Sequence, residues 1–490
     1  MLLVTSDAIP KPTLMPWTDS PWRRVVVYGL GLSGRAAASW LLARNIQVVA
    51  FDQRTQEEIA KDPSFDSLRR EPGLRLELGL EPQTLPQDLD WNGVDALILS
   101  PGVPADRPLV EDARVTGVPV LAEVELAFPF LRGTVLAITG SNGKSTTTAL
   151  AAAMLQGADR NAVACGNIGE PVISLVDAPG QRTFVVELSS FQLESVELFH
   201  PLAAALLNVA ADHLDRYDSL DDYRRAKLNV FRRQRHGDVA ILNADDPSAL
   251  AAAPELRARC RFFSRRGPVA DGCFLQDGKI LESAPDLETP RVLFEADDVP
   301  LPGVHQLENA MAAALLALAA GAEPDRLVRG LRSFHGLPHR LETVATLDDV
   351  AYYDDSKGTN PAAVVKSLEG FADGAVHLIV GGRFKGGDLG ELTDMAHRKV
   401  ARAYLIGESA ERFARCFSEQ RAVPYEIAST LDVAVQRAAA QAQPGQAVVL
   451  SPACSSFDQF ANFAERGKLF QQYVRALPQH SADGEDHSGA

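Results

Sequence analysis

The chain has 490 residues, of which 46% are hydrophobic and 23% are charged, and it carries a formal net charge of −16 at pH 7. This length exceeds what one hydrophobic core organises, so we expect about three domains. Dispersed lysines and arginines in an acidic chain argue against a nucleic-acid partner, and no apolar run approaches the roughly 18 residues that a membrane helix needs.

The two ends of the chain carry no folding pattern. The first residues, MLLVTSDAIPKPTLMPW, lack the basic start, the sustained apolar segment and the small-residue cleavage site of a signal peptide, so we expect a cytoplasmic protein. We assign residues 1–23 and 479–490 to tails. The second tail is expected to be disordered because its sequence, HSADGEDHSGA, is polar and unpatterned.

The first patterned stretch predicts a Rossmann-like domain over residues 24–125. The strand VVVY runs directly into a GxGxxG motif formed by Gly29, Gly31 and Gly34. A helix pattern follows, and the next strand, QVVAFD, ends at Asp52. We interpret the motif as a nucleotide or pyrophosphate site in which Asp52 accepts hydrogen bonds from a ribose or base. The alternative is a tight turn that only packs the helix against the sheet.

Residues 126–336 are predicted to form an ATP-binding domain like that of P-loop ATPases. The strand VLAITG runs into SNGKSTTT, which continues as an alanine-rich helix. Backbone N–H groups at such a helix start favour phosphate binding. Lys144 is expected to reach the terminal phosphates, and Ser145 or Thr146 a magnesium ion. The alternative is a Gly-Ser turn that only caps the helix.

Two later strands of this domain end in polar side chains. Glu187 ends one strand and Asn208 the next, so both could face one site at the carboxyl edge of the sheet. With His213 in the following loop and Lys227 on a helix, the group indicates magnesium ligands and their neighbours. Taken singly, Glu187 could be a solvated strand end, His213 a loop histidine and Lys227 a surface lysine. Short runs within 261–301 predict an antiparallel flap on the sheet.

The stretch 337–478 predicts a second Rossmann-like domain, with strand candidates VAYYDD, VHLIVGG, RAYLIG and AVVLSPA. Cations and hydroxyls would surround an anionic substrate if Asp355, Lys357, Thr359, Lys385 and Ser456 converge. Each could instead serve a turn or a helix cap. Phe457, Phe460 and Phe463 are spaced for one helical face and are expected to be core residues.

The alternation of strands and helices along the chain therefore predicts an α/β protein of three tandem domains with parallel sheets. The five cysteines form no CxxC pair, so neither a zinc site nor a disulfide framework is expected, and most should be small core residues.

A series of motifs then carries a family resemblance. They are TGSNGKSTTT, GNIGEP, VELSSFQLE, NVAADHLDRY, YRRAKL, GLPHRLE, DDSKGTN and SPACSSFDQF. In this order they resemble the Mur ligases of peptidoglycan synthesis, and the resemblance covers the chain from about residue 24 to 478. ELSSFQLE, DSKGTN and SPACSSFDQF most resemble the members that add D-glutamate.

The resemblance implies an ATP-dependent, amide-bond-forming ligase. ATP would phosphorylate the carboxylate of UDP-N-acetylmuramoyl-L-alanine, and the amine of D-glutamate would attack the acyl phosphate. A carboxylate is a poor electrophile and repels ATP, so a lysine and magnesium must offset charge while holding both groups in line. The resemblance also implies small-molecule substrates, and we expect a monomer with no membrane or nucleic-acid partner.

The resemblance assigns residues to each ligand. The ATP set is Gly140, Ser141, Asn142, Gly143, Lys144, Ser145, Thr146, Asn309, Arg340 and Asp355. The UDP-substrate set is Leu32, Ser33, Asp52, Gln53, Arg54, Gly102 and Asn167. The glutamate set is Lys357, Thr359, Lys385, Ser456 and Phe463. The catalytic set is Lys144, His213 and Lys227, and the metal set is Ser145, Glu187, His213 and Lys227.

The resemblance further implies two magnesium ions, with Lys227 carbamylated so that it offers oxygen ligands. The chain departs from the family pattern at two positions. A His-Asn pair reads His305-Gln306 here, and an Asp-Thr pair reads Asp52-Gln53.

Three alternatives remain open on the sequence. The first is the same ligation with L-glutamate or another amino acid, because mirror-image substrates share every functional group. The second is an NAD-dependent oxidoreductase built on the GxGxxG motif, which leaves Lys144 and Lys227 without a role. The third is a non-catalytic P-loop regulator, against which the glutamate set argues.

Overall fold

The computed structural model describes residues 22–81, 83–86, 89–210, 216–301, 303–334, 336–384, 386, 389–419 and 422–478. Apart from Trp22 and Arg23, both predicted tails lie outside these ranges. The chain divides into two compact units, Met1–Val299 with Leu307–Ser333 and Pro300–Gln306 with Phe334–Ala490. No helix within the described ranges is long and apolar enough to cross a membrane.

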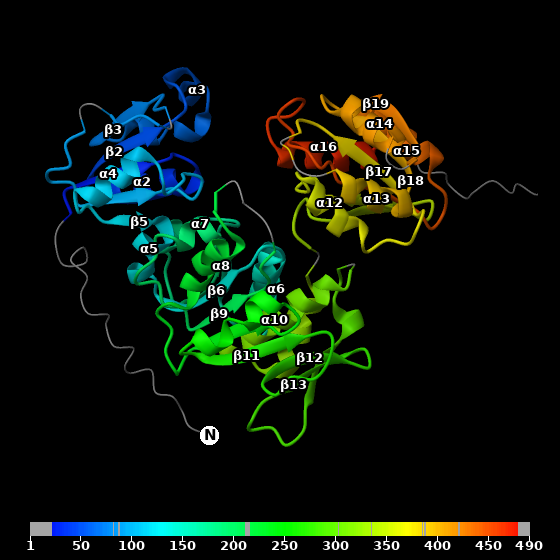
Figure 1. Cartoon of the computed structure of the whole chain (residues 1–490), viewed down its shortest axis with the longest axis horizontal. Helices are drawn as coiled ribbons and strands as arrows, with labels where there is room; N and C mark the ends of the chain where they lie inside the picture. The colour runs from blue at the N-terminus through cyan, green and yellow to red at the C-terminus, as the bar shows by residue number, and fades with distance from the viewer. Residues whose placement is uncertain are drawn as a thin grey trace, which may run out of the picture. The chain divides into compact units, whose positions relative to one another are not determined.

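The first unit contains a parallel five-stranded sheet, drawn in blue to cyan in Figure 1. Its elements are β1 Arg24–Tyr28, α2 Leu32–Leu42, β2 Gln47–Asp52, α3 Gln56–Ala60, β3 Leu74–Leu78, β4 Ala96–Leu99, α4 Pro108–Val115, β5 Val120–Ala122 and α5 Glu123–Ala127. The strand order β3-β2-β1-β4-β5 is that of a Rossmann-like fold, which confirms the prediction.

Strand β1 shows why its sequence is continuously apolar. Val25 and Val27 pack into one core cluster, whereas Val26 and Tyr28 pack into another. Successive side chains of a strand point to opposite faces, so a parallel sheet covered on both faces needs apolar residues at every position.

The same unit contains a nine-stranded sheet, drawn in cyan to green in Figure 1. Its strands are β6 Gly133–Thr139, β7 Ala162–Gly166, β8 Arg182–Glu187, β9 Ala203–Leu206, β10 Val239–Asn243, β11 Arg259–Ser264, β12 Gly272–Gln276, β13 Lys279–Ser283 and β14 Arg291–Glu295. They lie in the order β14-β13-β12-β11-β10-β9-β6-β8-β7. The pairs from β7 to β12 are parallel, and β12, β13 and β14 pair antiparallel, which confirms the predicted flap.

Helices α6 and α11 cross at a pair of glycines. The helices of this region are α6 Lys144–Gly157, α7 Ser190–Leu193, α8 Leu220–Leu228, α9 Pro247–Leu250, α10 His305–Ala319 and α11 Pro324–Arg332. A Cβ on Gly157 would lie 2.3 Å from the Gly330 nitrogen, and a Cβ on Gly330 would lie 2.0 Å from the Ala153 carbonyl oxygen. The two backbones are therefore in direct contact, which no larger residue at either glycine permits.

The second unit is built on a six-stranded sheet, drawn in yellow to red in Figure 1. Its strands are β15 Glu342–Leu347, β16 Val350–Asp354, β17 Val376–Gly381, β18 Val400–Ile406, β19 Tyr425–Ser429 and β20 Ala447–Leu450. Its helices are α12 Pro361–Leu368, α13 Gly390–Lys399, α14 Ala410–Glu419, α15 Leu431–Gln441 and α16 Phe463–Arg475. The order is β15-β16-β20-β17-β18-β19, parallel except for the β15-β16 pair. Apolar clusters cover both faces.

The predicted helical face of Phe457, Phe460 and Phe463 is wrong. Helix α16 begins only at Phe463, because the side chain of Asn462 accepts a hydrogen bond from the Glu465 nitrogen at 2.9 Å and so caps the helix. Phe457 lies before the helix and is 61% exposed, so it is not a core residue.

The prediction that most cysteines are core residues is confirmed. All five cysteines are free thiols, and Cys165, Cys273 and Cys454 are buried.

Candidate active site

The predicted strand, loop and helix of the phosphate-binding motif follow one another in the first unit. Strand β6 ends at Thr139, and α6 begins at Lys144. Gly143 adopts a left-handed conformation with φ of 84°, and a Cβ there would lie 2.3 Å from Oδ1 of Asn309. Thr147 Oγ1 donates to the same oxygen at 3.2 Å. Asn309, from the ATP set, therefore packs directly against the loop.

Asn208 supports this loop. Its Oδ1 accepts from the Asn142 nitrogen at 2.8 Å, its Nδ2 donates to the Asn142 carbonyl at 3.1 Å, and its own carbonyl accepts from the Ser141 nitrogen at 3.0 Å. The Asn208 amide thus holds the loop backbone, whereas the sequence suggested that it could face a ligand beside Glu187.

Two lysines converge on one carbonyl of the loop. Lys144 Nζ donates to the carbonyls of Gly140 and Ser141, both at 2.8 Å, and Lys227 Nζ donates to that of Gly140 at 2.9 Å. Lys227 is 1% exposed and its Nζ lies 4.2 Å from the centre of the Tyr223 ring, so it is not a surface lysine. The arrangement concentrates positive charge beside N–H groups that favour phosphate.

Glu187 provides a carboxylate that fits a magnesium ion. It lies at the end of β8 and is 2% exposed, and its Oε1 accepts from Nδ2 of Asn167 at 2.9 Å. Its Oε2 is buried and has no hydrogen-bond partner among the residues that the structure describes. A buried carboxylate oxygen without a partner is costly, and a hard cation is the ligand that such an oxygen prefers. Ser145, in the first turn of α6, supplies a hydroxyl of the kind that P-loop proteins use for the same ion.

Two expected site residues, His213 and Lys385, lie outside the described residues. The structure therefore describes three of the four residues of the expected metal set, Ser145, Glu187 and Lys227.

A cavity of about 530 Å³ opens beside the GxGxxG turn. All seven residues of the UDP-substrate set line it: Leu32, Ser33, Asp52, Gln53, Arg54, Gly102 and Asn167. Asn167 comes from the loop after β7, so residues from both sheets of the first unit contribute. Ser100 also lines the cavity and was not predicted, because a lone serine after a strand carries no specific signal.

Asp52 positions Arg54 at this cavity. Its Oδ1 accepts from the Arg54 nitrogen and Nε, both at 2.9 Å, and its Oδ2 accepts from Nη2 of Arg54 at 2.9 Å and from the Leu30 nitrogen at 2.6 Å. Burial tends to raise the pKa of Asp52, but these bonds outweigh it and hold the pKa below its usual value. Its lone pairs are therefore engaged within the chain, so that Asp52 holds the Arg54 guanidinium at the cavity, whereas the sequence suggested that Asp52 accepts hydrogen bonds from a ribose or base.

In the second unit, Asp355 is buried between two serines. Its Oδ2 accepts from Ser367 Oγ and Ser451 Oγ, both at 2.6 Å. Burial raises its pKa to about 6 although both hydroxyls favour the charged form. A Cβ on Gly358 would lie 2.7 Å from the same oxygen. The contacts of Asp355 therefore fix the loop that carries Lys357.

Lys357 and Phe463 of the glutamate set are in contact. The Lys357 Nζ lies 3.9 Å from the centre of the Phe463 ring, a cation–π arrangement that holds an exposed ammonium in place. Thr359 follows in the same loop, its nitrogen donating to the Lys357 carbonyl at 2.8 Å, and Ser456 is buried.

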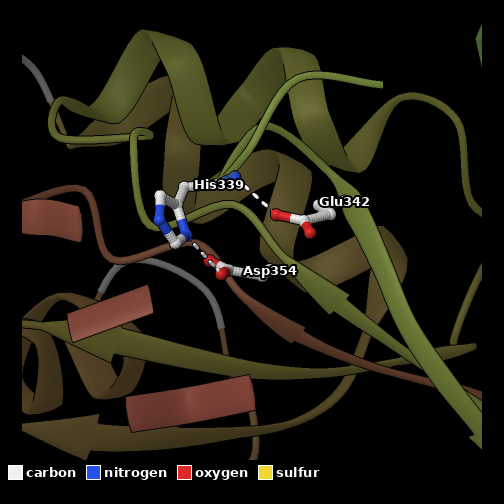
Figure 2. A group of neighbouring side chains, drawn as sticks. All are labelled: His339, Glu342 and Asp354. Carbon is white, nitrogen blue, oxygen red and sulfur yellow. Dashed lines mark hydrogen bonds and ion pairs between the residues drawn. The ribbon is translucent and has the colours of Figure 1, made fainter. Parts of the chain in front are cut away.

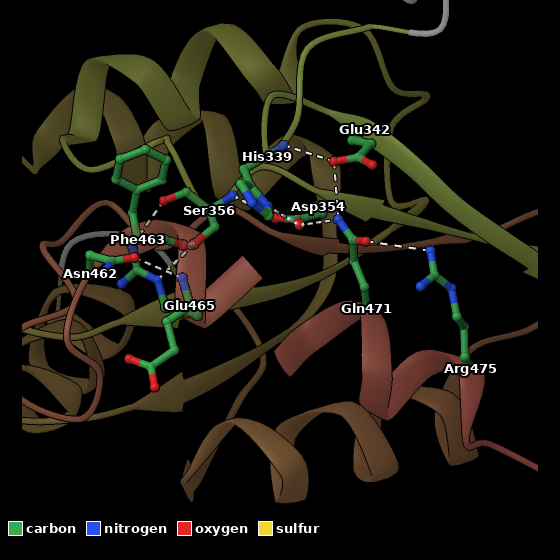
Figure 3. A network of polar contacts seen from close by, with 10 residues as sticks. His339, Glu342, Asp354, Ser356, Asn462, Phe463, Glu465, Gln471 and Arg475 are labelled. Atoms are coloured by element: carbon green, nitrogen blue, oxygen red, sulfur yellow. Dashed lines mark hydrogen bonds and ion pairs between the residues drawn. The ribbon is translucent and has the colours of Figure 1, made fainter. Parts of the chain in front are cut away.

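A cluster that the sequence reading missed lies at the start of the second unit. The potential ligand atoms of His339, Glu342 and Asp354 all lie within 4.8 Å of one another (Figure 2). His339 Nδ1 is 2.6 Å from Asp354 Oδ2, and Gln471 Nε2 donates to Asp354 Oδ2 and to Glu342 Oε2 at 2.9 and 3.0 Å (Figure 3). Because these groups satisfy one another, we interpret the cluster as a buried hydrogen-bond network and not as a metal centre.

Three domain families match the chain in sequence. They are the Mur ligase MurD-like N-terminal domain over residues 23–122, the Mur ligase middle domain over 138–317, and the Mur ligase glutamate ligase domain over 339–454.

Curated relatives match nearly end to end. The UDP-N-acetylmuramoylalanine–D-glutamate ligase of Acidobacterium capsulatum is 42% identical over 456 residues, which cover 93% of this chain and 96% of the relative. The protein of the same name from Koribacter versatilis is 40% identical over 461 residues, which cover 94% and 98%.

Solved structures share the fold at low sequence identity. The UDP-N-acetylmuramate-alanine ligase of Thermotoga maritima has a TM-score of 0.57 and 17% identity, covering 92% of this chain and 99% of that one. The folylpolyglutamate synthase of Mycobacterium tuberculosis, solved with ADP and AMPPCP, has a TM-score of 0.54 and 14% identity, covering 73% and 94%. These likenesses confirm the three-domain α/β architecture.

Proposed function

The chain belongs to the Mur ligase family, and from this premise we propose that it adds D-glutamate to UDP-N-acetylmuramoyl-L-alanine with ATP, in peptidoglycan precursor synthesis. The observation that carries the proposal is the extent of the likeness to D-glutamate ligases, since the relatives match over nearly their whole length. The family assignment argues against the oxidoreductase and the non-catalytic regulator.

The reaction begins with phosphoryl transfer to a carboxylate. We expect the ammonium of Lys144 to leave the Gly140 and Ser141 carbonyls and bind the terminal phosphates, because a charged acceptor is stronger than a neutral one. The loop N–H groups, held by Asn208, would orient the same phosphates. Asn309, Arg340 and Asp355 are proposed to bind the rest of the nucleotide.

Magnesium would be held by Ser145 and Glu187. Bound there, the ion supplies positive charge that lowers the repulsion between phosphates and carboxylate. The buried Oε2 of Glu187 supports this assignment. We further propose a second ion, held with His213 and a carbamylated Lys227.

Carbamylation suits the surroundings of Lys227. Burial disfavours a charged ammonium, and a neutral amine adds carbon dioxide to give a carbamate and one proton. The carbamate would replace a cation beside the phosphate loop by two oxygen ligands. We propose it as the form of Lys227 in the active enzyme.

The amino-acid substrate would bind in the second unit. Glutamate carries two carboxylates, and Lys357 and Lys385 would bind them, with Thr359, Ser456 and Phe463 completing the pocket. The seven residues of the UDP-substrate set would bind the nucleotide end of the other substrate. We also propose that the protein is a monomer and acts in the cytoplasm, where ATP and nucleotide-linked precursors occur, and that its domains span 24–125, 126–336 and 337–478.

Phosphate release tests the proposal directly. The protein is incubated with ATP, magnesium and UDP-N-acetylmuramoyl-L-alanine, with D-glutamate, with L-glutamate or without an amino acid. We expect release that depends on D-glutamate. Release with L-glutamate alone would retain the mechanism and change the substrate, and no release in any arm would contradict the proposal.

A further inference from the structure

Arg466, on helix α16, is a fully buried arginine. Its hydrogen bonds go to neutral groups among the residues described, and burial lowers its pKa only to about 10, so that it stays charged at neutral pH. Burying a charge is costly, and the nearby carboxylates of Asp458, Asp354 and Asp355 offset part of that cost without bonding to it directly.

The Arg466 guanidinium joins two loops of the second unit. Its Nε donates to Ser356 Oγ at 3.0 Å, and its Nη2 donates to the Ser356 carbonyl at 2.9 Å and to the Cys454 carbonyl at 3.1 Å. Ser356 directly precedes Lys357, and Cys454 lies two positions before Ser456. One planar group thus spans the two loops that carry expected glutamate-binding residues.

The same arginine lies beside a third segment, and its neighbour Ser356 bonds to the start of α16. Its Nη1 is buried without a hydrogen-bond partner among the described residues, and a Cβ on Gly382 would lie 3.3 Å from it. Gly382 lies three positions before Lys385 in the sequence. Ser356 Oγ in turn donates to the Phe463 carbonyl at 2.8 Å, which ties the start of α16 to the loop (Figure 3).

We propose that Arg466 is a positioning residue for the acidic amino acid, because it bonds the loops that carry Lys357 and Ser456 to the helix that begins at Phe463. The inference rests on the proposed function. The planar guanidinium joins these loops better than a lysine ammonium would, since its N–H groups point in fixed directions to acceptors on different loops.

The test compares Michaelis constants in the full-length protein. Arg466→Met removes the fork and the charge, Arg466→Lys keeps the charge, and Ser356→Ala removes one acceptor as a milder change. Arg475→Met is the matched control, because Arg475 lies on the same helix, is exposed, and donates a long hydrogen bond to the Gln471 side chain, at 3.4 Å. Phosphate release is measured while ATP, the UDP-linked substrate and D-glutamate are varied in turn, with melting temperatures recorded for each variant.

We expect Arg466→Met to raise the KM for D-glutamate about 30-fold or more, the size of effect that loss of charged hydrogen bonds gives, with the other two KM values within about 3-fold. Arg466→Lys and Ser356→Ala should fall between Arg466→Met and the unsubstituted protein, and Arg475→Met should match the latter. If Arg466→Met does not fold, the two milder variants decide.

Two results would overturn the inference alone. One is an unchanged KM for D-glutamate in folded Arg466 variants while the unsubstituted protein turns over D-glutamate normally. The other is an equal change in all three KM values with a lower melting temperature, which indicates only a structural role. Lack of D-glutamate-dependent release by the unsubstituted protein would instead overturn the proposed function, and this inference with it.

Discussion

Lys227 in the first unit and Arg466 in the second are both fully buried cations that donate to backbone carbonyls of loops that carry expected site residues. Lys227 reaches one loop carbonyl through a single nitrogen, whereas Arg466 spans two loops through a fork. A lysine can lose its proton and change chemically, and an arginine cannot. The comparison teaches that a buried cation can serve either reactivity or geometry, and that the residue type indicates which.

The comparison is tested most strongly by replacing Lys227. We expect Lys227→Arg and Lys227→Ala both to lower kcat by about a thousandfold or more, because neither side chain forms a carbamate. Lys227→Ala should regain part of its activity with added short carboxylates, whereas Lys227→Arg should not because its side chain fills the space. Phosphate release with and without acetate measures this. Retained activity in Lys227→Arg would show that Lys227 serves only as a cation.

Glu187 tests whether the Lys227 region is built around a metal ion. Glu187→Gln keeps the shape and the bond to Asn167 but removes the charge, so we expect the magnesium concentration for half-maximal rate to rise about tenfold to a hundredfold. A magnesium titration of phosphate release measures the shift. Glu170→Gln is a control on a nearby carboxylate outside the metal set. An unchanged magnesium requirement in Glu187→Gln would remove Glu187 from the metal set.

Replacing Gly467, the residue after Arg466, tests whether this part of the second unit depends on close packing. A Cβ there would lie 2.1 Å from Nδ1 of His339 and 2.7 Å from Oδ2 of Asp354, so Gly467→Ala must displace a buried hydrogen-bonded pair. We expect the free energy of unfolding to fall by about 3 kcal/mol. Chemical denaturation measures it, with Gly237→Ala as the control, since a Cβ there meets nothing within 4 Å and Gly237, like Gly467, has no positive φ. Equal losses in both variants would contradict the assigned steric cause.

Glu123 provides a buried charge outside both regions. Its Oε1 accepts from the Ile173 nitrogen at 2.6 Å, its Oε2 has no partner among described residues, and burial raises its pKa to about 7. The folded state therefore holds the proton more tightly than the unfolded state, and the resulting stability, present below about pH 4.5, is lost as pH rises toward 7.

We expect Glu123→Gln to remove this pH dependence. The free energy of unfolding of Glu123→Gln, minus that of the unsubstituted protein, should be about 2 kcal/mol higher at pH 8 than at pH 5. Denaturation curves at both pH values measure the difference, with the exposed Glu111→Gln as the control. Parallel stability changes in the unsubstituted protein and Glu123→Gln would contradict the assigned cause.

Much of the fold could be predicted from the sequence because the central strands are continuous apolar runs, as in β1. The strands that the sequence reading missed, β3, β5, β7, β15 and β19, are short or lie at sheet edges. Strand β5 has only three residues, and β19 reads YEIAS, with exposed positions along it. Local pattern is weak in such strands, and pairing with a neighbour defines them.

The candidate site was predictable only where residues form motifs. The phosphate loop was predicted from its own motif, and the seven cavity residues of the UDP-substrate set from the family resemblance. The support that Asn208 gives the loop, the His339 network and the contacts of Arg466 join residues far apart in sequence, such as Arg466 and Ser356, which lie 110 positions apart. No local signal encodes such a contact, because only the tertiary fold brings the partners together.

The glycine crossing of α6 and α11 fixes the far end of the helix that begins at the phosphate loop, so a shift at the crossing would tilt the helix. Lys144 and Gly157 are the first and last residues of α6, so roughly 20 Å of helix separates the loop from the crossing. A rotation of about 3° at the crossing would move Lys144 by about 1 Å, a misplacement that can cost about a hundredfold in rate. Substitutions at Gly157 or Gly330 would thus lower the rate by rotating α6 and displacing Lys144, although both glycines lie at the other end of the helix.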